Sequence, residues 1–333
     1  MIALGYKASA EQFGPRQLLD FAEAAERNGF DSVAVSDHFQ PFRHTGGHAP
    51  AALPWLGALA VRTERVRIGT SVTTPTMRFH PSLVAQAFAT IACLAPDRVF
   101  LGVGSGESMN EVPALDIDWP GFKERLDRLT EAIQLIRELW SSERVSFAGS
   151  YYRTRNATIY DLPDHPPPIL VAAAGPRAAR RVGEIADGFI TTSGKPRELY
   201  VDSLLPALEE GARGAGRDPN QLEKLLEVKV SYDRDRQRAV DECRFWAPLA
   251  LPAEAKQGVD DPVELERLAD DPSVHAESRF IVTGDPQELA DRVGEYVEMG
   301  FRHLVFHSPS PDQERFLRTF AAEALPVLRE RFG

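Results

Sequence analysis

Cysteine is scarce in this chain, and its scarcity excludes two classes of protein. Only Cys93 and Cys243 occur among 333 residues. Two cysteines cannot build a disulfide framework, and their separation matches no zinc site. Cys93 stands among apolar neighbours, which is typical of a small core residue. This cysteine usage favours a protein of the reducing cytoplasm.

Long apolar runs and an excess of basic charge are also missing. No run approaches the ~18 to 20 apolar residues of a membrane helix, and residues 1–7 lack the charged start and apolar stretch of a signal peptide. Lys and Arg number 38 against 49 Asp and Glu, which gives a formal net charge of −11. We therefore expect neither nucleic acid nor membrane as a partner. An anionic substrate would need a local cluster of Lys and Arg.

Apolar, β-rich runs alternate with amphipathic stretches of helical period almost from end to end. The clearest helix spans 17–28, with its apolar residues on one face and Gly29 as a C-cap. Other helices are expected at 82–94, from near Arg197 and at 312–331. The predicted strands are residues 2–9, 31–38, 66–74, 98–106, 169–174, 188–193, 226–231 and 303–307.

Strands that are apolar on both faces, each followed by a helix, predict an α/β fold with a parallel sheet covered on both sides. Eight of them favour a closed (β/α)8 TIM barrel over an open doubly wound sheet. We expect one domain over residues 1–333, with insertions near 145–167 and 245–280. Insertions in such barrels commonly build the rim at the carboxyl ends of the strands.

Polar residues cluster where the predicted strands end, which is where barrel enzymes carry their chemistry. The second strand ends in Asp37 and His38, and further polar ends lie at 71–74, 104–107 and 191–195. A histidine beside a carboxylate is a proton-transfer pair if both face one pocket, and otherwise a structural pair.

The glycine-rich run 102–107 does not fit a dinucleotide fingerprint, because Glu107 stands where the third glycine is needed. Its bare backbone allows either a planar cofactor to lie close or simply a tight turn. Asp37, His38, His44 and His48 match no standard ligand set, so no metal site is predicted.

Three basic residues, Lys195, Lys256 and Arg279, lie on separate segments near strand ends or in the second insertion. Taken singly, each is a solvated surface charge. Their placement also allows them to converge at the rim as an anion site.

Several blocks of this chain closely resemble the F420-dependent glucose-6-phosphate dehydrogenases, which are luciferase-like barrels and usually homodimers. The resemblance covers essentially the whole chain. The matching blocks are residues 5–13, 36–41, 44–50, 69–76, 85–90, 98–107, 192–195, 244–248, 260–262 and 303–307.

The resemblance implies an enzyme that oxidises C1 of a hexose 6-phosphate to the lactone and passes hydride to the deazaflavin coenzyme F420. In this family His38 corresponds to the base near the C1 hydroxyl, with Glu11 as its partner. Glu107 corresponds to the acid that protonates the reduced ring at N1. A base within ~3 Å of the hydroxyl takes its proton as hydride leaves C1.

The resemblance also implies two sets of binding residues. It places a cis peptide between the Ser and Val of the cofactor site. The implied phosphate pocket is Thr192, Lys195, Lys256 and Arg279. The implied cofactor-binding residues are Asp37, Ser71, Val72, Thr74, Ser105, Gly106, Ala173, Ala174 and Gly175.

One departure from the family concerns substrate choice. Phe42 stands where the family carries Trp beside the reacting sugar, and Phe lacks the indole N–H donor. Losing a hydrogen bond to a sugar hydroxyl weakens discrimination, so fructose 6-phosphate becomes a candidate substrate. Ala174 also replaces a Gly of the family pattern.

Two other functions stay open. One is a luciferase-like oxidoreductase that uses FMN or acts on another alcohol, which would have no use for the basic triad of Lys195, Lys256 and Arg279. The other is a non-enzymatic deazaflavin-binding protein, which would not need the proton-transfer groups His38 and Glu107.

Overall fold

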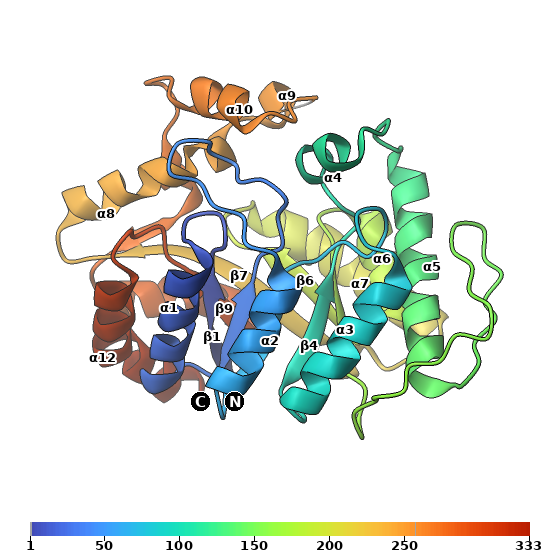
Figure 1. Cartoon of the computed structure of the whole chain (residues 1–333). Coiled ribbons are helices and arrows are strands. Elements are labelled where there is room, and N and C mark those ends of the chain that lie inside the picture. Colours follow the sequence, from blue (N-terminus) through green and yellow to red (C-terminus); the bar gives the residue numbers. More distant parts are fainter. Residues whose placement is uncertain (1, 257) are drawn as a thin grey trace.

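Eight parallel strands close into a barrel in the computed structural model, which describes residues 2–256 and 258–333 (Figure 1). Each strand pairs with the next along the chain, and the last pairs back with the first, in the register Leu4 to Leu304. The prediction of a closed (β/α)8 barrel is confirmed. The barrel strands are β1 Ala3–Ala8, β2 Ser32–Val35, β3 Arg67–Thr70, β4 Val99–Val103, β5 Ile169–Ala172, β6 Gly188–Thr192, β7 Glu223–Tyr232 and β9 His303–His307.

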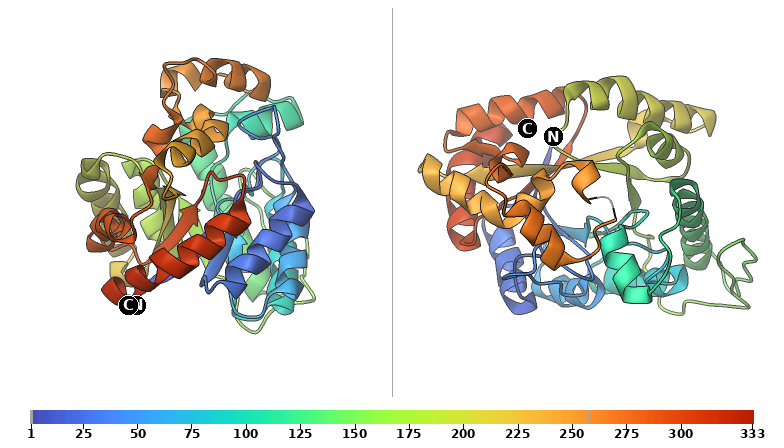
Figure 2. Two further views of the ribbon diagram at one scale, coloured as in Figure 1. Left: turned by 90° about the vertical axis from the view of Figure 1, so that its left-hand side faces the viewer. Right: turned by 90° about the horizontal axis from the view of Figure 1, so that it is seen from above.

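Helices surround the barrel and also cover one end of it (Figures 1 and 2). α4, α9 and α10 lie above the carboxyl ends of the strands, whereas both chain termini lie at the opposite end. No helix in the described part of the chain is both long and apolar enough to span a bilayer. The helices are α1 Pro15–Arg27, α2 Ala52–Arg62, α3 Pro81–Leu94, α4 Ser108–Leu115, α5 Phe122–Ser141, α6 Pro176–Ile185, α7 Leu205–Gly214, α8 Arg236–Glu242, α9 Ala253–Lys256, α10 Pro262–Ala269, α11 Pro286–Glu298 and α12 Gln313–Phe332.

The strands are apolar on both faces because they separate two layers of core. Inside the barrel, six buried side chains form one cluster, and the larger core lies between the strands and the helices. Several helices begin with proline, which fixes the helical φ and needs no N–H donor at that position. The interior cluster consists of Ala34, Phe100, Leu170, Ile190, Leu225 and Val305.

Four details differ from the sequence predictions. The second to fifth strands end two to four residues earlier than predicted, because their polar ends turn into the space above the barrel. β7 is longer than predicted, and its end pairs with an unpredicted strand, β8 (Ile281–Thr283). Cys93, predicted to lie in the core, is exposed.

The insertion 145–167 folds back on itself through bridges from Val145 to Ala157 and from Ala148 to Arg153. Glu131 of α5 accepts hydrogen bonds from three successive backbone N–H groups at its tip. The insertion contributes no residue to the lining of the cavity described below. That residues 1–333 form a single domain stays a prediction.

A polar network joins four strands at the end of the barrel opposite that cavity. Glu223, the first residue of β7, lies 2.9 Å from Arg67 Nη1 and 2.7 Å from His303 Nδ1. His303 Nε2 in turn lies 2.6 Å from Ser32 Oγ. Burial alone would raise the pKa of Glu223, but its hydrogen bonds and charge interactions with His303 and Arg67 lower that pKa to about 2.

We predict that Glu223→Gln is destabilising in a pH-dependent way. The folded pKa of about 2 lies below the unfolded value of about 4.3. The carboxylate therefore stabilises the fold fully above about pH 4.3 and loses this effect as the pH falls toward 2. Urea unfolding should show a deficit of about 2–3 kcal/mol at pH 7 that shrinks below about pH 4. Glu264→Gln, at an exposed pair with Arg267, is the control, and a pH-independent deficit in Glu223→Gln would contradict the assignment.

Candidate active site

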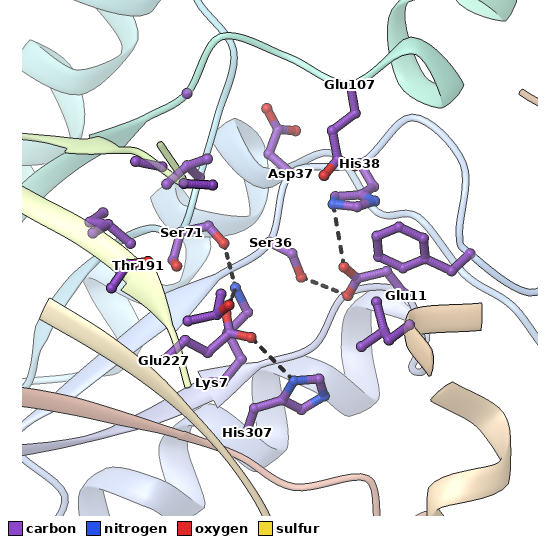
Figure 3. A pocket seen from close by; sticks show the side chains of 18 of the residues that line it. Lys7, Glu11, Ser36, Asp37, His38, Ser71, Glu107, Thr191, Glu227 and His307 are labelled. Carbon is purple, nitrogen blue, oxygen red and sulfur yellow. Dashed lines mark hydrogen bonds and ion pairs between the residues drawn. The ribbon is translucent and has the colours of Figure 1, made fainter. Parts of the chain in front are cut away.

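A cavity of about 430 Å³ opens at the carboxyl ends of the barrel strands (Figure 3). It is walled by residues that follow the strands and by the insertion 245–280. Gly175, at the N-cap of α6, and Lys195, exposed at the rim, do not line it. The predicted site residues that do line it are Glu11, Asp37, His38, Phe42, Ser71, Val72, Thr74, Ser105, Gly106, Glu107, Ala173, Ala174, Thr192, Lys256 and Arg279.

His38 and Glu11 face each other across one side of the cavity (Figure 3). His38 Nε2 lies 3.6 Å from Glu11 Oε1, and Ser36 Oγ donates to Glu11 Oε2 at 2.6 Å. Ser36 Oγ accepts from the backbone N–H of Ala10, which fixes the hydroxyl. His38 Nδ1 is buried and has no partner among the described residues. His38 lines the cavity and can exchange a proton with a ligand there, while Glu11 stabilises the charged form of the ring through Nε2.

Phe42 and Trp246 form an aromatic wall beside His38. The Phe42 ring lies 4.9 Å from the His38 ring and 6.4 Å from the Trp246 ring, measured between centroids. Trp246 Nε1 donates to Gln12 Oε1 at 3.1 Å. Since Phe42 has no donor and the Trp246 donor is occupied, this wall offers a ligand no indole N–H.

Small residues form another wall of the cavity. The peptide between Ser71 and Val72 is cis, as predicted. A Cβ atom on Gly104 would lie 2.8 Å from Val72 Cγ2, so only glycine leaves this surface open. Gly106 has a φ of 85°, which side chains other than glycine rarely adopt. Three alanines extend this flat, uncrowded surface, namely Ala172, Ala173 and Ala174.

Asp37 supplies a buried acceptor to the cavity. Its Oδ2 accepts from Thr73 Oγ1 and lies 3.5 Å from Arg78 Nη2. Arg78 also contacts Glu111 at 3.4 Å, and burial raises the pKa of Glu111 despite this pairing. Asp37 Oδ1 is buried without a partner in the part of the chain that the structure describes. A buried acceptor of this kind calls for a donor from a ligand or from water.

The predicted basic residues come together at the rim of the cavity. Lys256 and Arg279 line the cavity with Thr192. Lys195 is close to them: its pKa is lowered by burial and then by the charges of Arg279, Lys229 and Lys256. Arg279 Nε is buried and has no partner among the described residues. Such a concentration of cations favours an anionic ligand.

The sequence analysis missed four charged or titratable residues at the floor of the cavity, namely Lys7, Glu227, Lys229 and His307. Glu227 lies 3.1 Å from Lys7 Nζ and 3.2 Å from Lys229 Nζ. Burial would raise the pKa of Glu227, but these two lysines hold it well below the usual range. Their signal in the sequence was a set of charged side chains on the inward face of otherwise apolar strands.

The residues weighed for a metal site in the sequence were Asp37, His38, His44 and His48. Within residues 2–256 and 258–333, no three His, Cys, Asp or Glu side chains gather as a metal site requires. One of these histidines, His48, lies in the loop after β2, where its backbone N–H donates to the carbonyl oxygen of Glu11.

Comparison with known sequences identifies full-length relatives. The model of a family described as luciferase-like monooxygenase matches residues 2–303. The protein named F420-dependent glucose-6-phosphate dehydrogenase in Beutenbergia cavernae is 61% identical to this chain, over 99% of this chain and 98% of the relative. The protein of that name in Nakamurella multipartita is 58% identical, over 100% of this chain and 98% of the relative. The one in Mycobacterium tuberculosis is 53% identical, over 98% of both.

Comparison with solved structures gives the same architecture. An F420-dependent secondary alcohol dehydrogenase in complex with an F420-acetone adduct is 35% identical, with a TM-score of 0.92 over 98% of this chain and 99% of that one. The coenzyme F420-dependent tetrahydromethanopterin reductase from Methanopyrus kandleri is 21% identical, with a TM-score of 0.81 over 100% and 99%. The second likeness concerns the fold alone.

Proposed function

The chain belongs to the luciferase-like family, and on this premise we propose that it is a coenzyme F420-dependent dehydrogenase that oxidises glucose 6-phosphate at C1 to the lactone. One observation carries the proposal. A single cavity combines the proton-transfer pair His38 and Glu11, a flat wall of small residues, and the cations Lys256 and Arg279. The full-length relatives named for this activity support it.

The cavity fits a planar deazaflavin. A Cβ atom on Gly104 would lie 2.8 Å from Val72 Cγ2, and Asp37 Oδ1 has no hydrogen-bond partner among the described residues. When bound, coenzyme F420 supplies the hydride acceptor, while the protein supplies orientation. The residues that would hold it are Asp37, Ser71, Val72, Thr74, Ser105, Gly106, Ala173, Ala174 and, beyond the cavity wall, Gly175.

His38 is assigned the proton of the C1 hydroxyl. Its ring lines the cavity and can accept that proton, and Glu11, itself held by Ser36, stabilises the resulting imidazolium. This pairing favours the protonated ring that forms as hydride leaves C1. Glu107, which also lines the cavity, is assigned the proton for N1 of the ring. Phe42 packs beside the reacting centre.

The substrate's phosphate is assigned to Thr192, Lys195, Lys256 and Arg279. A hydroxyl and three cations can hold a dianion through charge-assisted hydrogen bonds. This local concentration overcomes the formal net charge of −11.

A second candidate is the oxidation of a small secondary alcohol, which the structural likeness to such a dehydrogenase favours. The two functions differ in their need for cations. An uncharged alcohol gives Lys256 and Arg279 no partner, whereas a phosphate pairs with both.

Absorbance of oxidised coenzyme F420 near its visible maximum tests the proposal. Parallel assays would contain glucose 6-phosphate, fructose 6-phosphate, free glucose and isopropanol. We expect bleaching with glucose 6-phosphate and none with free glucose or isopropanol. Bleaching with isopropanol alone would establish the second candidate instead.

We predict that Lys256→Ala weakens sugar-phosphate binding and spares the cofactor. Removing one cation from a partly buried anion site should raise KM for glucose 6-phosphate by about 2 kcal/mol in binding energy, which is ~30-fold. Coenzyme binding, followed by fluorescence quenching, should stay unchanged. Lys123→Ala, on the exposed face of α5, is the control, and an unchanged KM in Lys256→Ala would remove Lys256 from the phosphate site.

We predict that Phe42 broadens substrate choice. Phe42→Trp adds an indole N–H beside the sugar and should raise the ratio of kcat/KM for glucose 6-phosphate over its epimer mannose 6-phosphate by about tenfold. Phe42→Leu also lacks a donor and should produce no such gain. Equal ratios in the Trp variant and the parent would show that this position does not read sugar hydroxyls.

We also propose a cytoplasmic homodimer. Both cysteines are unpaired, which suits a reducing compartment. Neighbouring helices α2 and α3 expose Val61 at 65%, Leu83 at 57% and Leu94 at 48% of their surfaces. We assign the association surface to these two helices, because they expose several large apolar side chains.

Leu83→Glu should therefore shift the protein from dimer to monomer in sedimentation velocity, because a charge cannot be buried unpaired at an apolar interface. Val263→Glu, at an exposed apolar residue of α10, serves as its control and should leave the dimer intact. A dimer unaffected by Leu83→Glu would place the interface elsewhere.

A further inference from the structure

Two buried ammonium groups share the Glu227 carboxylate at the floor of the cavity. Figure 3 shows Glu227 with Lys7 and His307. Lys7 lies on one oxygen of Glu227 and Lys229 on the other. His307 Nδ1 lies 3.4 Å from the same carboxylate, and burial lowers the pKa of His307, so its ring adds no charge at neutral pH. Among the described residues of the floor, two lysines therefore face one carboxylate, that of Glu227.

Lys229 carries its charge toward the phosphate side of the cavity. Glu227 and Lys229 are two residues apart on β7, so both side chains point into the barrel, and Lys229 is nearer the rim. Its side chain is only 6% exposed and lines the cavity. Lys229 contributes to lowering the pKa of Lys195, and Arg279 to lowering that of Lys229, although burial is the main cause in both cases.

The two lysines differ in how fully the protein satisfies them. Lys7 has two partners, Glu227 and the backbone carbonyl of Ser71. Among the described residues, Glu227 is the one carboxylate that reaches Lys229. An ammonium has three donors, and a buried charge is stable only when paired and hydrogen-bonded. The remaining donors of Lys229 are therefore available to a ligand in the cavity.

We propose that Lys229 is a fourth cation of the anion pocket and contacts the substrate's phosphate from its inner side. Glu227 is the positioning residue that holds Lys229 there. The inference rests on the proposed function, since it requires a phosphorylated substrate. A cation at the inner side sets how deeply the phosphate enters, and hence where C1 lies relative to His38.

Two matched variants test this assignment, Lys229→Met and Lys7→Met. Each removes one floor cation and leaves Glu227 with one lysine, so their effects on the balance of floor charges are equal. Calorimetric titration of the full chain, loaded with coenzyme F420, would use inorganic phosphate as the ligand. We expect Lys229→Met to weaken phosphate binding by about tenfold or more, and Lys7→Met by less than about threefold. Lys229→Arg, which keeps the charge, should recover most of the affinity.

The possible outcomes separate this inference from the proposed function. If the unsubstituted protein binds phosphate and oxidises glucose 6-phosphate while Lys229→Met binds phosphate equally well, the inference alone fails. Equal losses of phosphate affinity in both variants would show that Lys229 acts only through the total charge of the floor, and would overturn the inference. A protein that neither binds phosphate nor oxidises the sugar phosphate would overturn the proposed function first. Should Lys229→Met not fold, Lys229→Gln must show the same loss.

Discussion

All eight barrel strands run in one direction, and this constraint places the chemistry of the protein. Because parallel strands end at one rim, Glu11, His38 and Glu107 meet around one cavity although they lie far apart in sequence. The opposite end carries the network of Glu223 and His303, which ties strands together away from any ligand. Stability and chemistry are therefore assigned to opposite ends of the same strands.

The cavity divides into two surfaces of different physical character. Glycines and alanines form a wall of small residues that suits a planar ring, whereas Lys256 and Arg279 concentrate positive charge at the rim. Glu227 lies between these surfaces at the floor, with a lysine on each carboxylate oxygen. In a protein of net charge −11, this local reversal of charge is what an anionic substrate requires.

Much of this was predictable from the sequence, because apolar runs bounded by turns identify buried parallel strands, and 303–307 was predicted at its observed bounds. The family resemblance supplied the cis peptide and the residues of the site. β8 was missed because three residues carry too little pattern. Lys7 and Glu227 were missed because a charge within a strand is ordinarily solvated, and only the closed barrel buries them. Whether a rim residue lines the cavity, as Lys256 does and Gly175 does not, depends on loop geometry that local sequence does not encode.

We propose that hydride leaves C1 of a hexose 6-phosphate held in this cavity and passes directly to coenzyme F420. Glucose 6-phosphate deuterated at C1 tests it, with mass spectrometry of the reduced coenzyme after turnover in ordinary water. We expect one deuterium in the reduced coenzyme and slower turnover of the deuterated sugar phosphate than of the unlabelled one. A reduced coenzyme without deuterium would show that the hydride comes from elsewhere and would contradict the assignment of His38 to the C1 hydroxyl.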